Sequence, residues 1–144
     1  MTHAILYRVL QTAFRELGIR HFQPEEFVPL RRKVPPFPLW GHIIPTAIVL
    51  DSLRTQFGPI TITSGYRDPD YNISVGGGVS SQHVQFTAAD IVARDHSADA
   101  VFEWLDASSW SPRLALGRYD TFTHLDTRNW VTRAAWPARW DNRT

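Results

Sequence analysis

A short apolar segment that contains one carboxylate places the tightest constraint on how this chain can fold. Residues 87–92 read Thr-Ala-Ala-Asp-Ile-Val, a small and β-branched run that is typical of a buried strand. Asp90 lies inside this run, and an unpaired carboxylate in an apolar environment is costly. The chain must therefore bring a cation or strong hydrogen-bond donors to Asp90.

Two histidines are the candidates for groups that meet Asp90. His83 follows a glycine-rich stretch at residues 74–81, which can deliver a side chain from outside a sheet. His124 lies in a second predicted strand, residues 118–127. Two imidazoles and one carboxylate form the three-ligand set of a catalytic zinc site, which keeps its fourth position open. The chain has no cysteine, so a zinc site must rely on imidazole and carboxylate.

The predicted strand at residues 118–127 also carries further polar side chains. Period-two alternation puts four residues on one face, namely Asp120, Phe122, His124 and Asp126. A polar stripe on a core strand usually marks a functional site.

Several motifs occur in an order that resembles a known family. They are Ile62 to Pro69, Asn72, Val75 to Gly77, Ser81 to His83, Ala88 to Asp90, and Phe122 to Asp126. Together they resemble the M15 family of zinc D-alanyl-D-alanine carboxypeptidases and related peptidoglycan peptidases, in particular its subfamily A, over residues 22–130. The resemblance implies that His83, Asp90 and His124 bind zinc. It also implies that Arg67 and Ser81 line a substrate groove.

The sequence departs from the family pattern at two positions. Phe86 stands where the family usually has glycine, so we expect a differently shaped loop or a bulkier wall there. Thr121 stands where the family has its acidic catalytic residue. We therefore expect Asp120 to act as the general base. Asp126 is the alternative, although it can instead orient a ligand histidine.

The function that this resemblance implies is zinc-dependent cleavage of peptidoglycan stem peptides or cross-links, by a carboxypeptidase or an endopeptidase. A phage lysis enzyme or a virion-associated enzyme would fit this activity. The alternative is a catalytically weak or inactive metal-binding module of the same fold, and Thr121 is the feature that favours it.

Length and patterning predict one domain over residues 1–144. Helices are expected within residues 1–20, after Pro45 and from Ser97 to about Ala107, and residues 131–144 are expected to form a C-terminal tail. Strands and helices alternate without a regular βαβ rhythm, which favours an α+β fold with a small antiparallel sheet flanked by helices. The resemblance implies the hedgehog/D-Ala-D-Ala peptidase-like version of this fold.

Charge and hydropathy exclude several classes of protein. The formal net charge of +1 argues against a dedicated nucleic-acid binder. No stretch has the ~20 apolar residues of a membrane span, and arginines interrupt the apolar positions of residues 1–17 where a signal peptide would be continuous. We expect synthesis as a soluble cytoplasmic protein that acts on the cell wall after release or within a phage particle.

One arginine and three tryptophans each allow both a binding role and a structural role. Arg67 suits a substrate carboxylate, because its planar fork binds carboxylates in a bidentate manner, but it could instead pair with Asp68 or Asp70. Three tryptophans are expected to pack rather than to bind sugars, and they are Trp130, Trp136 and Trp140.

Overall fold

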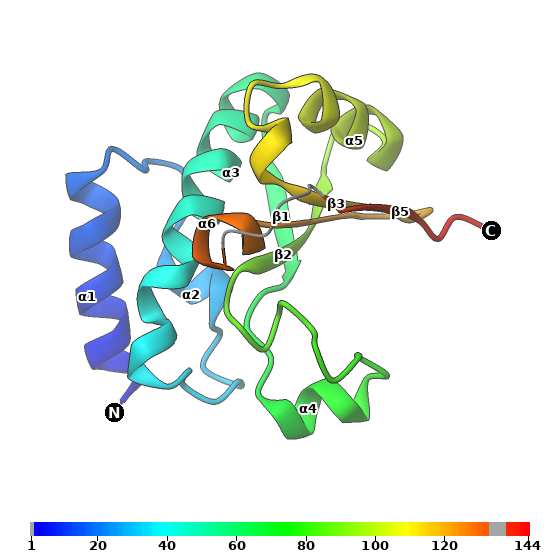
Figure 1. Cartoon of the computed structure of the whole chain (residues 1–144). Coiled ribbons are helices and arrows are strands. Elements are labelled where there is room, and N and C mark those ends of the chain that lie inside the picture. The colour runs from blue at the N-terminus through cyan, green and yellow to red at the C-terminus, as the bar shows by residue number, and fades with distance from the viewer. Residues whose placement is uncertain (1, 133–137) are drawn as a thin grey trace.

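The computed structural model describes residues 2–132 and 138–144, in which helices surround one five-stranded sheet (Figure 1). The α-helices are α1 (His3–Glu16), α2 (Pro24–Phe27), α3 (Ile44–Phe57), α4 (Pro69–Ser74), α5 (Ala98–Ala107) and α6 (Arg128–Thr132). The 3-10 helices are η1 (Phe37–Ile43) and η2 (Ser111–Arg113). The strands are β1 (Ile60–Ser64), β2 (Ala88–Ala93), β3 (Ala115–Arg118), β4 (Thr123–Asp126) and β5 (Arg139–Asp141). The predicted α+β class is confirmed.

The sheet is mixed because its last strand runs parallel to its neighbour. The strand order is β1-β2-β4-β3-β5, and every neighbouring pair is antiparallel except β3 and β5. Strand β5 lies within residues 131–144, which the sequence analysis assigned to a C-terminal tail. Residues 139–141 of that segment are instead an edge strand, and Trp136 lies outside the described residues.

The prediction of one strand over residues 118–127 was wrong. Strand β3 ends at Arg118 and β4 begins at Thr123, and the two form an antiparallel hairpin. The residues between them turn the chain back on itself. Alternation along one strand therefore does not extend from Asp120 to His124.

Side-chain alternation gives the sheet two different faces. Ala89 and Ile91 of β2 and Leu125 of β4 are buried in the main hydrophobic core. Helices α1 and α3 lie on one side of the sheet (Figure 1), and their buried apolar residues belong to the same core. Since Asp90 and His124 alternate with these residues, they project from the opposite face.

Local sequence signals define the helix boundaries. The Thr2 hydroxyl accepts a hydrogen bond from the Ile5 amide at the start of α1, and Ser97 does the same for Ala100 at the start of α5. Gly58 ends α3 with a positive φ of 77°. The three predicted helices are confirmed. None of the described helices combines the length and the apolar character needed to cross a bilayer.

Gly65 lies directly against the backbone of Phe27, so we expect Gly65→Ala to destabilise the fold. A Cβ at position 65 would come within 2.3 Å of the Phe27 carbonyl oxygen. Overpacking of this kind costs about 1–3 kcal/mol of the free energy of unfolding. Gly41→Ala is the matched control, because a Cβ there meets no atom within 4 Å. Thermal denaturation measures the difference, and equal melting temperatures would contradict this packing.

Candidate metal centre

The candidate site is built on one row of residues that crosses the whole sheet. Cross-strand pairs join Ser64 to Asp90, Asp90 to His124, His124 to Gly117, and Gly117 to Trp140. Directly paired residues project from the same face of a sheet. Each of the five strands therefore contributes one residue to this face.

His83, Asp90 and His124 converge at the centre of the row. His124 Nδ1 lies 2.9 Å from Asp90 Oδ1, and His83 Nε2 lies 3.3 Å from Asp90 Oδ2. One ligand atom from each residue lies within 4.8 Å of the others, and the three residues are only 4–7% exposed. Two imidazole nitrogens and a carboxylate oxygen at this spacing can hold a metal ion with a position left open.

The loop between α4 and β2 delivers His83 to this cluster. The backbone amide of Arg67 donates to the His83 carbonyl oxygen at 3.2 Å, which ties the loop to the end of β1. The His83 amide donates to the Ser81 hydroxyl, and the Ser81 amide donates to the Gly78 carbonyl oxygen. His83 therefore reaches the sheet from outside it, as the sequence analysis expected.

Each histidine is oriented by an acceptor on its outer side. His83 Nδ1 donates to the Gly65 carbonyl oxygen at 2.7 Å, and His124 Nε2 donates to Asp126 Oδ2 at 2.8 Å. These acceptors assign hydrogen to the outer nitrogens. His83 Nε2 and His124 Nδ1 thus face Asp90 as the two nitrogens available to a metal.

Asp126 is fully occupied by its neighbours. The Arg128 side chain donates to both of its oxygens at 2.9 Å, and the Arg128 amide adds a bond of 3.1 Å. Its side chain is completely buried. This geometry supports the alternative in which Asp126 orients a ligand histidine, because no face of its carboxylate is open to water.

Hydrogen bonds and neighbouring charges shift the pKa values of the buried groups in the opposite direction to burial. Burial alone would raise the pKa of Asp90, but hydrogen bonds and charge from His124 and His83 hold it well below its usual range. Burial also acts to raise the pKa of Asp126, and hydrogen bonds from Arg128 and His124 lower it overall. Burial acts to lower the pKa of His124, and hydrogen bonds to the same two aspartates raise it overall. Both carboxylates are therefore charged at neutral pH, and a metal would displace a proton from His124.

A pocket of about 500 Å³ opens over the cluster. Arg67 and Ser81, the two expected substrate-binding residues, both line it. Arg67 Nε donates to Ser64 at 3.1 Å, while its terminal nitrogens lie 3.4 Å from Asp90 and 3.5 Å from Asn72. The terminal contacts are long, so the guanidinium can still bind a further acceptor. Asp68 and Asp70 approach Lys33 instead.

The structure does not bring Asp120 to the cluster. Asp120 lies exposed in the turn of the β3–β4 hairpin, and its carboxylate accepts hydrogen bonds from the amide and the hydroxyl of Thr144. It lines a separate hollow with Asp141, Arg143 and Thr144. The expected placement beside His124 was wrong, because the turn interrupts the alternation on which it rested. Among the described residues, Asp90 is the one carboxylate that lines the pocket over the cluster.

Phe86 keeps a glycine-like backbone at the position where the sequence departs from the family pattern. Its φ is 60°, in the left-handed region that costs a non-glycine residue roughly 1–2 kcal/mol. The side chain is fully buried and packs edge-on against Tyr66 at 5.7 Å between ring centroids. Core burial offsets the strain, and Phe86 does not line the pocket.

An aromatic wall closes one side of the pocket, and two of its residues, Tyr119 and Trp140, were not predicted from the sequence. It consists of Tyr119, Phe122 and Trp140. The ring centroids of Trp140 and His124 are 5.0 Å apart. No local sequence signal could place Trp140 here, because its position depends on parallel pairing between β5 and β3. Trp130 packs against Trp110, as expected of a packing residue.

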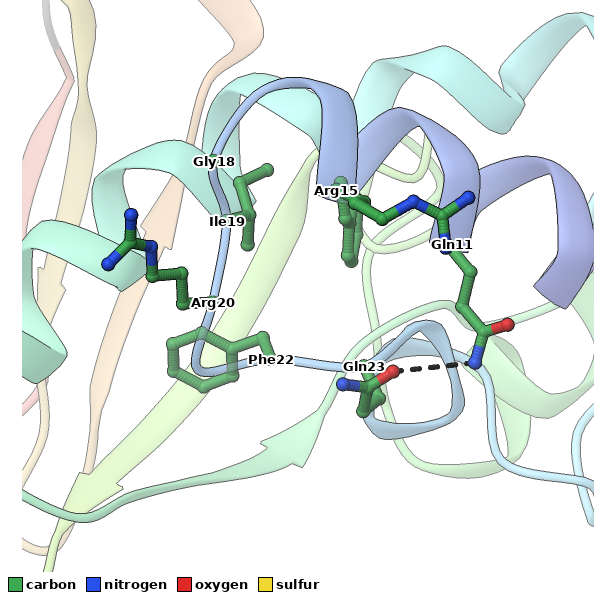
Figure 2. A pocket seen from close by; sticks show the side chains of 8 residues that line it. Gln11, Arg15, Gly18, Ile19, Arg20, Phe22 and Gln23 are labelled. Atoms are coloured by element: carbon green, nitrogen blue, oxygen red, sulfur yellow. Dashed lines mark hydrogen bonds between the residues drawn. The ribbon is translucent and has the colours of Figure 1, made fainter.

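A second hollow of similar size lies at the end of α1 (Figure 2). Its lining includes Arg15, Arg20, Gln11 and Gln23, and none of its lining residues is a histidine or a carboxylate. The Arg15 and Arg20 side chains point away from one another in Figure 2, so they form no clamp. The chemistry of the two linings therefore indicates that the functional site is the pocket lined by His83 and Asp90, and not the hollow at the end of α1.

Comparison with known families agrees with this geometry. The family model described as Peptidase M15 matches residues 20–126, which include the whole cluster. The chain belongs to the peptidase M15 family. No match was found among curated proteins. Family membership and the His-Asp-His cluster together support a metallopeptidase.

Asp126→Asn tests whether Asp126 holds His124 for a metal. We expect the affinity for Zn²⁺ to fall about 10- to 100-fold, because the hydrogen bond to Nε2 loses its charge. Competition with a chromogenic chelator measures this affinity. Asp95→Asn is the control, since Asp95 is exposed and pairs with its neighbour Arg94. An unchanged affinity in Asp126→Asn would leave Asp126 without a role at the metal.

Proposed function

We propose that this chain is a zinc-dependent peptidase that cleaves peptidoglycan stem peptides or their cross-links, as a carboxypeptidase or an endopeptidase. The buried cluster of His83, Asp90 and His124 is the observation that carries the proposal of metal dependence. Membership of the peptidase M15 family supports a peptide substrate. Peptidoglycan is proposed because the motifs of the chain resemble those of peptidoglycan peptidases.

The donor set fits zinc better than a hard cation. Imidazole nitrogens suit zinc, whereas calcium and magnesium prefer an all-oxygen shell. When bound, zinc would polarise the scissile carbonyl and lower the pKa of its water toward ~7. In this proposal His83 Nε2, His124 Nδ1 and the Asp90 carboxylate are the ligand atoms. Asp126 and the Gly65 carbonyl hold the two imidazole rings in place.

Arg67 is proposed to bind a carboxylate of the substrate. It lines the pocket beside Asp90, and its terminal nitrogens make only long contacts within the described part of the chain. A guanidinium fork suits the free carboxylates of stem peptides. Ser81 lines the same pocket and is proposed to contact the peptide there.

The proposed place of action is the bacterial cell wall. The substrate resides there, and we propose that the enzyme reaches it after release from a cell or from within a phage particle.

A metal-binding module without turnover is the second candidate. The observation that favours it is that no described residue brings a free carboxylate to the pocket, since Asp126 is covered and Asp120 lies elsewhere. Zinc content combined with the release of amines from purified peptidoglycan separates the two. Bound zinc with no released amines would favour the module.

Removal of either histidine should abolish stoichiometric zinc binding and cleavage. We expect His83→Ala and His124→Ala to retain less than stoichiometric zinc, because two ligands seldom hold a catalytic zinc. Metal analysis and digestion of purified peptidoglycan, with mass spectrometry of the fragments, measure the two effects. His21→Ala is the control, as His21 is exposed and lies outside the cluster. Full zinc occupancy in both cluster variants would refute the ligand assignment.

Arg67→Lys tests the proposed substrate clamp. An ammonium cannot reproduce a bidentate contact, so we expect KM to rise at least roughly tenfold for peptides with a free terminal carboxylate. Zinc content should stay at the level of the parent chain. Arg94→Lys is the control, because Arg94 is exposed and pairs with the adjacent Asp95. An unchanged KM in Arg67→Lys would indicate that Arg67 has a purely structural role.

A further inference from the structure

The aromatic wall of the pocket depends on a strand outside the family match. Trp140 belongs to β5, beyond residues 20–126. Its indole ring lies over Gly117, where an added Cβ would come within 2.4 Å of the ring. Gly117 is the direct cross-strand partner of both His124 and Trp140. The missing side chain at position 117 thus lets the indole ring approach His124.

The Tyr119 side chain is held at this wall by three contacts. Trp140 Nε1 donates to the Tyr119 oxygen at 3.0 Å, and Asn142 Nδ2 donates to it at 3.4 Å. The Tyr119 ring stacks on Phe122 with centroids 4.2 Å apart and planes 15° apart. A phenol oxygen that accepts two hydrogen bonds still carries its own hydrogen. No acceptor for this hydrogen occurs in the part of the chain that the structure describes.

We infer that the Tyr119 hydroxyl is the hydrogen-bond donor that stabilises the oxyanion during peptide cleavage, and that Trp140 is the residue that positions it. The inference rests on the proposed peptidase function. Tyr119 lines the same pocket as His83, Asp90 and His124, and its hydroxyl is hydrogen-bonded to Trp140, whose ring also contacts His124. Donors placed in advance toward developing charge are among the largest contributions to catalysis.

Hydrolysis of the peptide bond needs no proton from Tyr119. The oxygen of water forms a bond to the scissile carbonyl carbon, and the carbonyl oxygen takes up negative charge. The C–N bond then breaks, and the proton released by the water ends on the leaving amine. Tyr119 donates a hydrogen bond to the charged oxygen throughout and keeps its own proton.

A purely structural role for Tyr119 is the alternative. The two bonds to its oxygen also tie Trp140 and Asn142 to the hairpin. In that case loss of the hydroxyl would lower the melting temperature and leave the kinetic constants unchanged.

Tyr119→Phe separates the two roles, because it keeps the ring that stacks on Phe122. We expect kcat on stem peptides to fall at least roughly tenfold, with KM and zinc content unchanged, as for the loss of one oxyanion donor. Tyr71→Phe is the matched control, since Tyr71 lies outside this pocket. If the parent chain is active and Tyr119→Phe has the same kcat, the inference is overturned and the proposed function stands.

Binding of a phosphinate dipeptide supplies a readout that does not need turnover. Its tetrahedral phosphorus carries the charged oxygens of the transition state, so Tyr119→Phe should weaken its binding to the zinc-loaded protein by a factor similar to the loss of kcat. Calorimetry with the zinc-loaded proteins measures this. If the parent chain cleaves nothing but the phosphinate binds Tyr119→Phe more weakly, the proposed function falls, and Tyr119 is a hydrogen-bond donor to a charged ligand without a role in cleavage. If neither readout responds to Tyr119→Phe, the inference falls.

Trp140→Phe tests the positioning role. It removes the Nε1 donor and keeps an aromatic ring, so kcat should fall less than in Tyr119→Phe, with little change in KM. The double variant should lose no more than Tyr119→Phe alone, because Trp140 acts through the hydroxyl. Additive losses would show that Trp140 does not act through Tyr119.

Discussion

The architecture around the site depends on the burial of the Asp90 carboxylate on strand β2 of the sheet. A charge in that position is stable only when opposite charges and donors surround it. His83, His124 and Arg67 come from three different parts of the chain to supply them. The glycine-rich loop, the end of β1 and the β3–β4 hairpin therefore have to meet at one point. A metal ion fits the same point, because the two imidazoles that neutralise Asp90 are also ligands.

The two faces of the sheet have different roles, one in the stability of the core and the other at the candidate site. One face contributes Ala89, Ile91 and Leu125 to a core that it shares with α1 and α3. The other face carries the row of paired residues on which the candidate metal site and the pocket are built. Rigid strands hold functional groups more precisely than loops do, and the loop residue His83 is fixed to the same sheet by the Gly65 carbonyl.

The pocket lies over the buried residues His83, Asp90 and His124, and its rim has few acidic groups among the described residues. Asp126 serves His124 and Arg128, so the side chains left around the opening include an arginine, hydroxyls and an aromatic wall. Such a lining favours contacts with negative charge, whether on a substrate carboxylate or on a developing oxyanion. This distribution of charge links the proposed roles of Arg67 and Tyr119, which both line one opening.

The sequence by itself determined the fold class and three of the helices, and it singled out His83, Asp90 and His124 as candidate metal ligands. Those features depend on local patterns, such as the capping residue Ser97, and on a charged residue inside an apolar strand. Only the tertiary structure decided where Asp120 and Trp140 lie. A period-two pattern does not show where a hairpin turns, so it placed Asp120 beside His124 when the residue belongs to the turn. Trp140 reaches His124 through the parallel pairing of β5 with β3, a contact between distant segments that no local pattern encodes.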